Sequence, residues 1–264
     1  MIFTKMHGLG NDYLYLYGEV PGNAAELSKK LSERHLGAGS DGMIYISTSN
    51  IADFKMRIFN ADGSEAKMCG NGIRCVGKFV YDKGYTDKKF ISIETLSGVK
   101  YLTLQVAGGK VKTVAVDMGQ AKAEKPINLT VDGETVSLIP VSVGNPHAVI
   151  FVDDIEKAPL TKLGPKIEHH EAFPDGLNVE FVEVLGADKL RMRVWERGSG
   201  VTMACGTGAC ASVMAAIAAK LFHYDETVSV LLDGGTLKIQ IAPDNTVQMT
   251  GPAETVYEGE TEIC

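Results

Sequence analysis

The sequence predicts an α+β protein built from two homologous domains, each a barrel-like curved β-sheet around a central helix. Three observations support this fold class. The chain matches itself at a constant offset. Each half has short alternating or apolar runs typical of strands, and each half carries a helical segment with an apolar face after a Gly-rich turn. We expect a pseudo-two-fold relation between the domains, with the active site in the cleft between them.

The internal repeat appears when the sequence is shifted by 136 residues, because several regions then come into register without a gap. Gly8 meets Gly144, and the run Cys69-Gly-Asn-Gly meets Cys205-Gly-Thr-Gly. The further matches pair 13–17 with 149–153, Gly42 with Asn178, 54–60 with 190–196, and Gly98 with Gly234. We therefore expect one domain over 1–118 and a second over 119–255. The tail, 256–264, is expected to pack back on the first domain, and 119–126 is the predicted linker.

The two halves give the same order of elements. In the first half we predict strands at 14–17, 43–46, 54–59, 90–94 and 99–106, with helices at 24–35 and 72–83. In the second half we predict strands at 149–152, 179–184, 190–195, 228–232 and 237–241, with a helix at 208–222. That last helix is apolar almost all round, which indicates that it is buried on every side.

The composition weighs against several classes of partner. Of 264 residues, 45% are hydrophobic and 22% are charged, and 26 basic against 33 acidic residues give a net charge of −7. Nucleic acids and anionic membranes select basic surfaces, so neither is an expected partner. The longest apolar stretch, 209–219, is too short to span a bilayer. Without a recognisable targeting segment, we expect a cytoplasmic protein whose five cysteines are reduced.

Two of the cysteines stand at predicted helix starts. Cys69 and Cys205 each precede a Gly-x-Gly and then a helix. Unpaired amides and the positive end of the helix dipole stabilise a thiolate there, so we expect a lowered thiol pKa. The same amides can hold a carboxylate. One sulfur on each face of a substrate carbon is the geometry that inverts a stereocentre, since one thiolate removes a proton and the opposite thiol supplies one.

Taken alone, either cysteine motif is better explained as a small buried residue at a tight turn, and the repeat is what favours the functional reading. Polar residues follow the same register. Asn60 and Glu196 lie nine residues before the two cysteines, and Asn11 pairs with His147. Glu196 and His147 are candidates for tuning the thiols; the alternative is that each caps a turn or is an ordinary polar group on the surface.

At these residues the sequence resembles diaminopimelate epimerases, and the match covers essentially the whole chain. The matching motifs are FTKMHGLGND at 3–12, FNADGS at 59–64, MCGNGIRC at 68–75, GNPH at 144–147, NV at 178–179, ERG at 196–198 and ACGTG at 204–208. The resemblance implies an isomerase that interconverts LL- and meso-2,6-diaminopimelate for lysine and peptidoglycan synthesis. It also implies a homodimer that needs neither pyridoxal phosphate nor a metal.

The resemblance also assigns roles to residues. Cys69 and Cys205 correspond to the catalytic base and acid, and His147 and Glu196 to residues that tune them. The residues corresponding to substrate contacts are Asn11, Asn60, Gly70, Asn71, Asn145, Asn178, Arg197, Gly206 and Thr207. Many family members have Gln at the position of Gly42, where it contacts substrate, so that contact is not carried over. Cys75 is expected to be structural, and neither Cys210 nor Cys264 has an assigned chemistry.

Other classes of function remain open. A proline-type or broader-specificity racemase is the nearest alternative, although Asn71 stands where proline racemases typically have His. A zinc or redox site is disfavoured because Cys69 and Cys75 are six positions apart. A nucleotide site is disfavoured because neither Gly-rich turn has the spacing of a dinucleotide or P-loop motif. A non-enzymatic binding protein would keep the helix-start anion site without needing both thiols.

Overall fold

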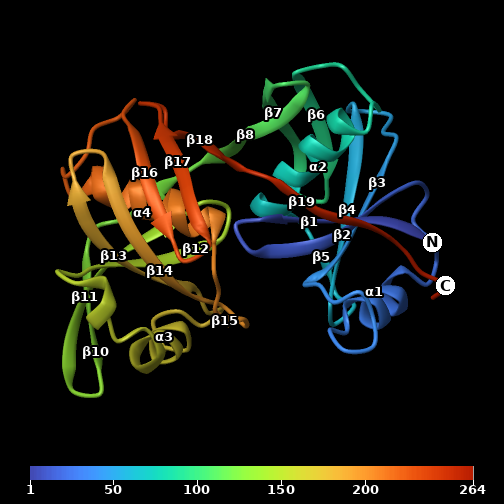
Figure 1. The fold of residues 1–264 in the computed structure, drawn as a ribbon. Coiled ribbons are helices and arrows are strands. Elements are labelled where there is room, and N and C mark those ends of the chain that lie inside the picture. The colour runs from blue at the N-terminus through green and yellow to red at the C-terminus, as the bar shows by residue number, and fades with distance from the viewer. Residues whose placement is uncertain (264) are drawn as a thin grey trace. The chain divides into compact units, whose positions relative to one another are not determined.

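A computed structural model of the chain describes residues 1–263, so Cys264 lies outside the described residues. The chain forms two compact units (Figure 1). The first comprises Met1–Val116 together with the chain from Gly251 onward, and the second comprises Asp117–Thr250. The chain passes into the second unit within β8, Lys110–Gln120, and returns within β18, Thr246–Pro252.

The first unit is a mixed sheet with two helices. Its strands are β1 (Ile2–Gly8), β2 (Asn11–Tyr17), β3 (Gly42–Ser47), β4 (Phe54–Asn60), β5 (Glu65–Ala66), β6 (Phe90–Thr95), β7 (Gly98–Ala107), β8 and β19 (Glu254–Glu260). Its helices are α1 (Ala24–Ser32) and α2 (Gly70–Asp82). The pairing order is β19-β1-β2-β3-β4-β6-β7-β8, in which β2 runs parallel to β3 and β4 parallel to β6 while the other pairs are antiparallel.

The second unit repeats this topology. Its strands are β9 (Lys122–Ala123), β10 (Ile127–Val131), β11 (Glu134–Ser142), β12 (Pro146–Phe151), β13 (Asn178–Gly186), β14 (Lys189–Glu196), β15 (Gly200–Val201), β16 (Thr227–Leu232), β17 (Gly235–Ile241) and β18. Its helices are η1 (Ile155–Lys157), α3 (Leu160–Glu168) and α4 (Gly206–Ala218). The order β9-β11-β12-β13-β14-β16-β17-β18 has its parallel pairs at the same two places. The predicted repeat and α+β fold class are therefore confirmed.

The central helices α2 and α4 are buried. Every residue of α2 from Asn71 to Val80 is buried, and α4 is buried at Gly206 and from Gly208 to Ile217. Helix α2 packs on β1, β2 and β7, whereas α4 packs on β11, β12, β13 and β17 (Figure 1). The apolar character of α4 on all sides thus reflects a position inside the curved sheet of its unit.

Helix α4 ends earlier than the sequence predicts, at Ala218 instead of residue 222. Lys220 adopts a left-handed φ of 61°, and the Leu221 amide donates back to the Ala216 carbonyl. This is the hydrogen-bonding pattern with which helices commonly end, but a glycine usually occupies the left-handed position. Because Lys220 takes that role, no glycine in the sequence marks the end of the helix.

Helices α1 and α3 form an outer layer, and α3 is absent from the sequence prediction. Gly164 and Pro165 stand inside α3, and both disfavour a helix. Gly164 is required by packing, since a Cβ there would lie 2.7 Å from the Cβ of Trp195 on β14. Apolar residues of the two helices fill a separate core on the sheet in each unit, with Leu27 and Leu31 in the first and Leu163 and Ile167 in the second.

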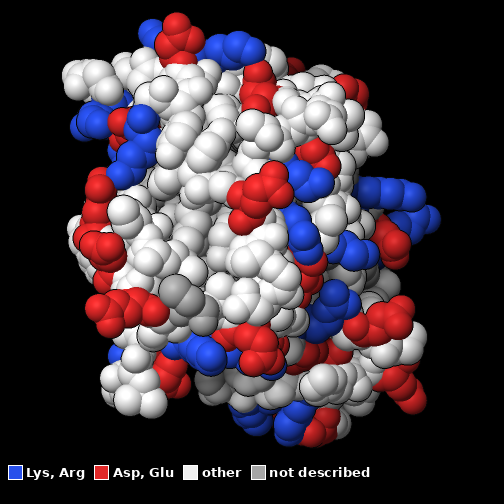
Figure 2. Space-filling model, turned by 90° about the vertical axis from the view of Figure 1, so that its right-hand side faces the viewer, with Lys and Arg blue, Asp and Glu red and all other residues white. Residues whose placement is uncertain are grey.

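The surface carries charges of both signs. On the face shown in Figure 2, acidic and basic side chains are interspersed among uncharged residues, without a continuous basic patch. Among residues 1–263, no helix has the length and apolarity needed to cross a bilayer.

Candidate active site

The two predicted thiols occupy equivalent positions, each as the N-cap of the central helix of its unit. Cys69 caps α2 with φ −138° and ψ 115°, and Cys205 caps α4 with φ −112° and ψ 110°. Each sulfur accepts a hydrogen bond at 3.3 Å from the amide three residues later, that of Gly72 or Gly208. The two helix starts are thus built to the same geometry, as the 136-residue register predicts.

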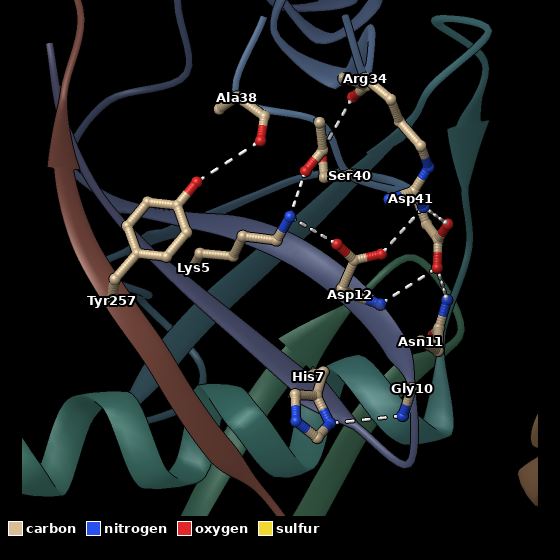
Figure 3. A network of polar contacts seen from close by, with 12 residues as sticks. Lys5, His7, Gly10, Asn11, Asp12, Arg34, Ala38, Ser40, Asp41 and Tyr257 are labelled. Atoms are coloured by element: carbon tan, nitrogen blue, oxygen red, sulfur yellow. Dashed lines mark hydrogen bonds and ion pairs between the residues drawn. The ribbon is translucent and has the colours of Figure 1, made fainter. Parts of the chain in front are cut away.

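Asn11, at the start of β2, is the side chain that faces Cys69. The Cys69 Sγ donates to Asn11 Oδ1 at 3.3 Å. The Asn11 Nδ2 donates to Asp41 Oδ2 at 2.8 Å, so the carboxylate fixes which end of the amide faces the sulfur (Figure 3). Because an amide oxygen only accepts, this arrangement matches Cys69 as a thiol that donates.

A network of charged side chains holds Asp41 in place (Figure 3). The Asp12 amide donates to Asp41 Oδ2 at 3.0 Å. The Arg34 guanidinium contacts Asp41 Oδ1 at 3.0 Å and Asp12 Oδ1 at 3.2 Å, and Lys5 Nζ lies 2.9 Å from Asp12 Oδ2. Two cations therefore balance two carboxylates behind Asn11. Asp41 was not among the residues predicted from the sequence, although its place directly before Gly42 in the run Gly-Ser-Asp-Gly was a usable signal.

Tyr13, also missed by the sequence analysis, lies beside Cys69. Burial raises the pKa of its hydroxyl well above the usual range, and the neighbouring Cys69 sulfur raises it further. The phenol is therefore neutral at physiological pH. It points along the same face of β2 as Asn11, two residues away.

Asn60 and Gly42 face each other across β3 and β4 in the sheet register. Asn60 Nδ2 donates to Ser64 Oγ at 3.0 Å. Gly42 has a φ of +156°, and a Cβ there would lie 2.2 Å from the Phe59 carbonyl oxygen and 2.9 Å from Tyr13. No side chain fits at position 42 without a shift of the backbone. Position 42 thus offers no side chain to a ligand in this arrangement of β3 and β4.

The first turn of α2 is anchored by a buried arginine. Arg74 is fully buried, and its guanidinium donates to the Gly70 carbonyl at 3.0 Å, to Asn71 Oδ1 at 3.0 Å and to the Pro252 carbonyl at 3.1 Å. The Asn71 side chain thus bonds within the first unit, and its backbone lies in the first turn of α2 beside Cys69.

Around Cys205 the surroundings are more acidic. Burial raises the pKa of the Cys205 thiol well above its usual range, and the Glu196 and Glu180 carboxylates raise it further. These effects outweigh the Thr207 hydroxyl, whose Oγ1 is 3.5 Å from the sulfur, and the Gly208 amide. The expectation of a lowered pKa is therefore wrong for Cys205, because burial of the thiol, reinforced by the two neighbouring carboxylates, outweighs the effect of the helix start.

Glu196 ends β14 and accepts a hydrogen bond from the Thr202 hydroxyl. Burial raises the pKa of the Glu196 carboxyl, while hydrogen bonds from Thr202 and Cys205 partly oppose this. Glu196 therefore lies close enough to the Cys205 thiol for each group to shift the pKa of the other.

His147 reaches the helix start through a chain of side chains. Its Nδ1 donates to Glu180 Oε1 at 2.7 Å, and its Nε2 lies 3.1 Å from Asn145 Oδ1. Asn145 Nδ2 in turn donates to Thr207 Oγ1 at 3.3 Å. Glu180 was missed by the sequence analysis. A Glu within the apolar run 179–182 of a strand was the available signal.

The remaining predicted residues lie beside this cluster. Asn178 opposes His147 in the register of β12 and β13. Its Oδ1 accepts from the Arg197 amide at 3.0 Å, and its Nδ2 donates to the Pro146 carbonyl at 3.2 Å. The Arg197 guanidinium donates to the Asp175 carbonyl at 3.0 Å and is solvent-exposed. Gly206 begins α4 directly after Cys205.

Within residues 1–263, no group of three or more His, Cys, Asp or Glu side chains is arranged to hold a metal ion. The polar groups around the two helix starts are instead hydrogen-bonding amides, hydroxyls and carboxylates.

Solved structures of other proteins share the fold of this chain. A phenazine biosynthesis protein of the PhzF family from Bacillus anthracis superposes with a TM-score of 0.77 at 16% identity, covering 100% of this chain and 99% of that one. A probable proline racemase from Agrobacterium radiobacter gives 0.74 at 15% identity, covering 100% and 93%. At these identities the likeness concerns the fold alone.

Sequence comparison is more specific. The diaminopimelate epimerase family model matches residues 3–124 and 139–256. A diaminopimelate epimerase from Acetivibrio thermocellus is 51% identical over 100% of this chain and 99% of its own length. The chain belongs to the diaminopimelate epimerase family, as the resemblance in the sequence predicts.

Proposed function

We propose that this protein interconverts LL- and meso-2,6-diaminopimelate by proton transfer at Cα between two thiols, without pyridoxal phosphate or a metal. The observation that carries the proposal is the pair of equivalent helix-start cysteines, one in each unit, in a chain of this family. The mechanism requires Cys69 and Cys205 to face opposite sides of the same substrate carbon.

In the proposed step, one cysteine acts as a thiolate and the other as a thiol. The thiolate takes the Cα proton, and the electron pair of the broken C–H bond moves toward the substrate carboxylate. The second thiol then donates its proton to the opposite face of Cα. Amides at the starts of α2 and α4 would stabilise the charge that accumulates on the carboxylate. In the direction that starts at Cys69, the raised pKa of Cys205 suits its role as the proton donor.

The substrate contacts are proposed from the same clusters. The backbones of Gly70, Asn71, Gly206 and Thr207 would hold the reacting carboxylate, because they lie in the first turns of the two helices. The distal amino-acid group would be recognised by polar side chains from both units. These are Asn11, Asn60, Asn145, Asn178 and Arg197.

The biological setting follows from the proposed reaction. The product would serve lysine and peptidoglycan precursor synthesis. Small-molecule metabolism with reduced catalytic thiols is consistent with a cytoplasmic enzyme, and a homodimer is the proposed assembly.

Alanine variants of the two cysteines test the two-thiol mechanism. We expect C69A and C205A each to abolish epimerisation of LL-diaminopimelate, since each removes one proton-transfer group. C210A is the matched control, because Cys210 is buried in α4 but is not at its start. In deuterated water, the epimerised product should acquire deuterium before the recovered substrate does. Intact activity in C69A or C205A, or equal early labelling of substrate and product, would contradict the mechanism.

The substrate is tested separately. Purified protein without added cofactor is assayed on LL-diaminopimelate, proline, lysine and glutamate. Turnover confined to diaminopimelate supports the proposal. Racemisation of proline or of several amino acids would favour the broader-specificity alternative, which Gly42 leaves room for because it offers no side chain to a distal group.

A further inference from the structure

Glu180 is a buried acid, and the reaction proposed above assigns it no role. Its side chain has no exposed surface, and neither does that of its hydrogen-bond partner His147. Glu180 Oε1 accepts from His147 Nδ1 at 2.7 Å, whereas Oε2 has no hydrogen-bond partner among the described residues. An ionisable oxygen buried without a partner is costly, so its retention calls for a specific explanation.

A second buried acid in the same unit shows what a structural role looks like. Glu168 uses both oxygens, accepting from Trp195 Nε1 at 2.6 Å and from the Gly198 amide at 2.8 Å. It thereby fastens α3 to β14 and the turn that follows it. Glu180 makes no such pair of fastening contacts, which sets it apart from an ordinary buried carboxylate.

The carboxylate of Glu180 also lies against the start of α4. A Cβ at Gly208 would be 2.7 Å from Glu180 Oε1 and 3.2 Å from Cys205 Sγ. Glycine at 208 therefore makes room for the carboxylate beside the first turn, where the positive end of the helix dipole favours a negative charge. Glu180 is in this way held close to both His147 and the thiol.

A continuous chain of contacts links Glu180 to Cys205. It runs from Glu180 to His147 at 2.7 Å, to Asn145 at 3.1 Å, to Thr207 at 3.3 Å and to the Cys205 sulfur at 3.5 Å. All of these residues belong to the second unit. The first link fixes the imidazole ring, and the ring orients the Asn145 amide toward the Thr207 hydroxyl.

We propose that Glu180 is a positioning residue for the reaction: its carboxylate fixes the His147 ring and, through His147 and Asn145, the Thr207 hydroxyl that contacts Cys205. Its negative charge, with that of Glu196, also keeps the Cys205 thiol protonated in the resting enzyme. The groups around this thiol are Glu180 from β13, Glu196 from β14 and Thr207 from α4, and His147 from β12 contacts Glu180. The proposal rests on the proposed function for its kinetic consequence, but its electrostatic consequence is independent of substrate.

The test compares E180Q with the wild type by two measurements. The first is the pH dependence of iodoacetamide alkylation at Cys205, followed by peptide mass spectrometry without substrate. Loss of the nearby negative charge should lower the midpoint for Cys205 by about 1 pH unit. The second is kcat for LL-diaminopimelate, which should fall by on the order of 100-fold. E183Q is the matched control, since Glu183 lies on the same strand and accepts from the Ile155 amide, away from Cys205. It should change neither measurement.

The E180D variant separates the effect of the charge from the effect of the carboxylate's position. It also tests the positioning role of Glu180 if E180Q does not fold. It keeps the negative charge but withdraws the carboxylate from His147 by one methylene. The alkylation profile should therefore stay near that of the wild type, while kcat falls. A wild-type alkylation profile in E180Q, or full kcat in E180D, would overturn the proposal. If the wild-type protein shows no epimerase activity, the proposed function fails, but the alkylation comparison still decides the electrostatic role of Glu180.

Discussion

The substitution Gly42→Ala tests the packing of β3 against β4 beside the candidate site. Gly42 has a φ of +156°, and a Cβ there would lie 2.2 Å from the Phe59 carbonyl oxygen and 2.9 Å from the Asn60 Cα. Both are backbone atoms of the neighbouring strand. The Phe59 carbonyl is also held by the Ser28 hydroxyl at 2.8 Å, so it cannot move aside freely.

The expected cost follows from these contacts. Inserting a methyl group into a packed region costs about 1–3 kcal/mol, and the unfavourable φ adds about 1 kcal/mol. A total of about 3 kcal/mol corresponds to a fall in Tm of roughly 6–12 °C for a protein of this size. Differential scanning calorimetry on the purified variant and the wild type measures this directly.

Gly84→Ala is the matched control. Gly84 also has a positive φ, +79°, but a Cβ there would meet no atom within 4 Å. It therefore reports the conformational penalty alone, about 1 kcal/mol. If G42A loses no more stability than G84A, the close approach of β4 does not determine the residue at position 42, and the reasoning is wrong.

Three further predictions concern charges around the site. Asp41→Asn should lower kcat/KM by about tenfold. The Asn11 amide then loses a charge-assisted hydrogen bond at 2.8 Å, which is about 1.4 kcal/mol stronger than a neutral one. An unchanged kcat/KM would show that Asp41 does not orient Asn11. Arg34→Ala should reduce kcat/KM by less than about fivefold, since the Arg34 side chain is 59% exposed; a loss as large as that of D41N would contradict this. Burial raises the pKa of the Glu196 carboxyl, so folding favours the protonated form of this group. At a pH above the usual titration range of a glutamate, the ionised Glu196 carboxylate therefore destabilises the fold. Glu196→Gln should therefore raise Tm at about pH 8 but not at about pH 4 while lowering kcat. A Tm difference independent of pH would refute that sign.

The repeat and the helix starts could be predicted from the sequence because they depend on local features. The 136-residue register needs only glycines, apolar runs and two Cys-Gly-x-Gly turns, and α4 reveals its burial by being apolar on all sides. Helix α3 could not be predicted from the sequence, because Gly164 and Pro165 disfavour a helix locally. Packing of Gly164 against Trp195 outweighs that preference.

The electrostatics of the site could not be predicted from spacing. The helix start at Cys205 indicates a thiolate, but Glu180 and Glu196 come from two different strands and reach the sulfur only in the folded unit. Asp41 and Tyr13 likewise approach Cys69 through tertiary contacts instead of sequence proximity. A local motif thus predicts where a thiol stands, whereas its proton affinity is set by neighbours distant along the chain.

The buried Arg74 has a consequence for the order in which the protein forms during synthesis. Its guanidinium needs the Pro252 carbonyl, and β1 needs β19 as its neighbour, yet both come from the last fifteen residues of the chain. A buried guanidinium without its acceptors is strongly unfavourable. The first half therefore emerges from the ribosome early but cannot reach its final packing until the last strand has been translated. The second half, whose sheet draws on a continuous stretch of sequence, is free to fold first.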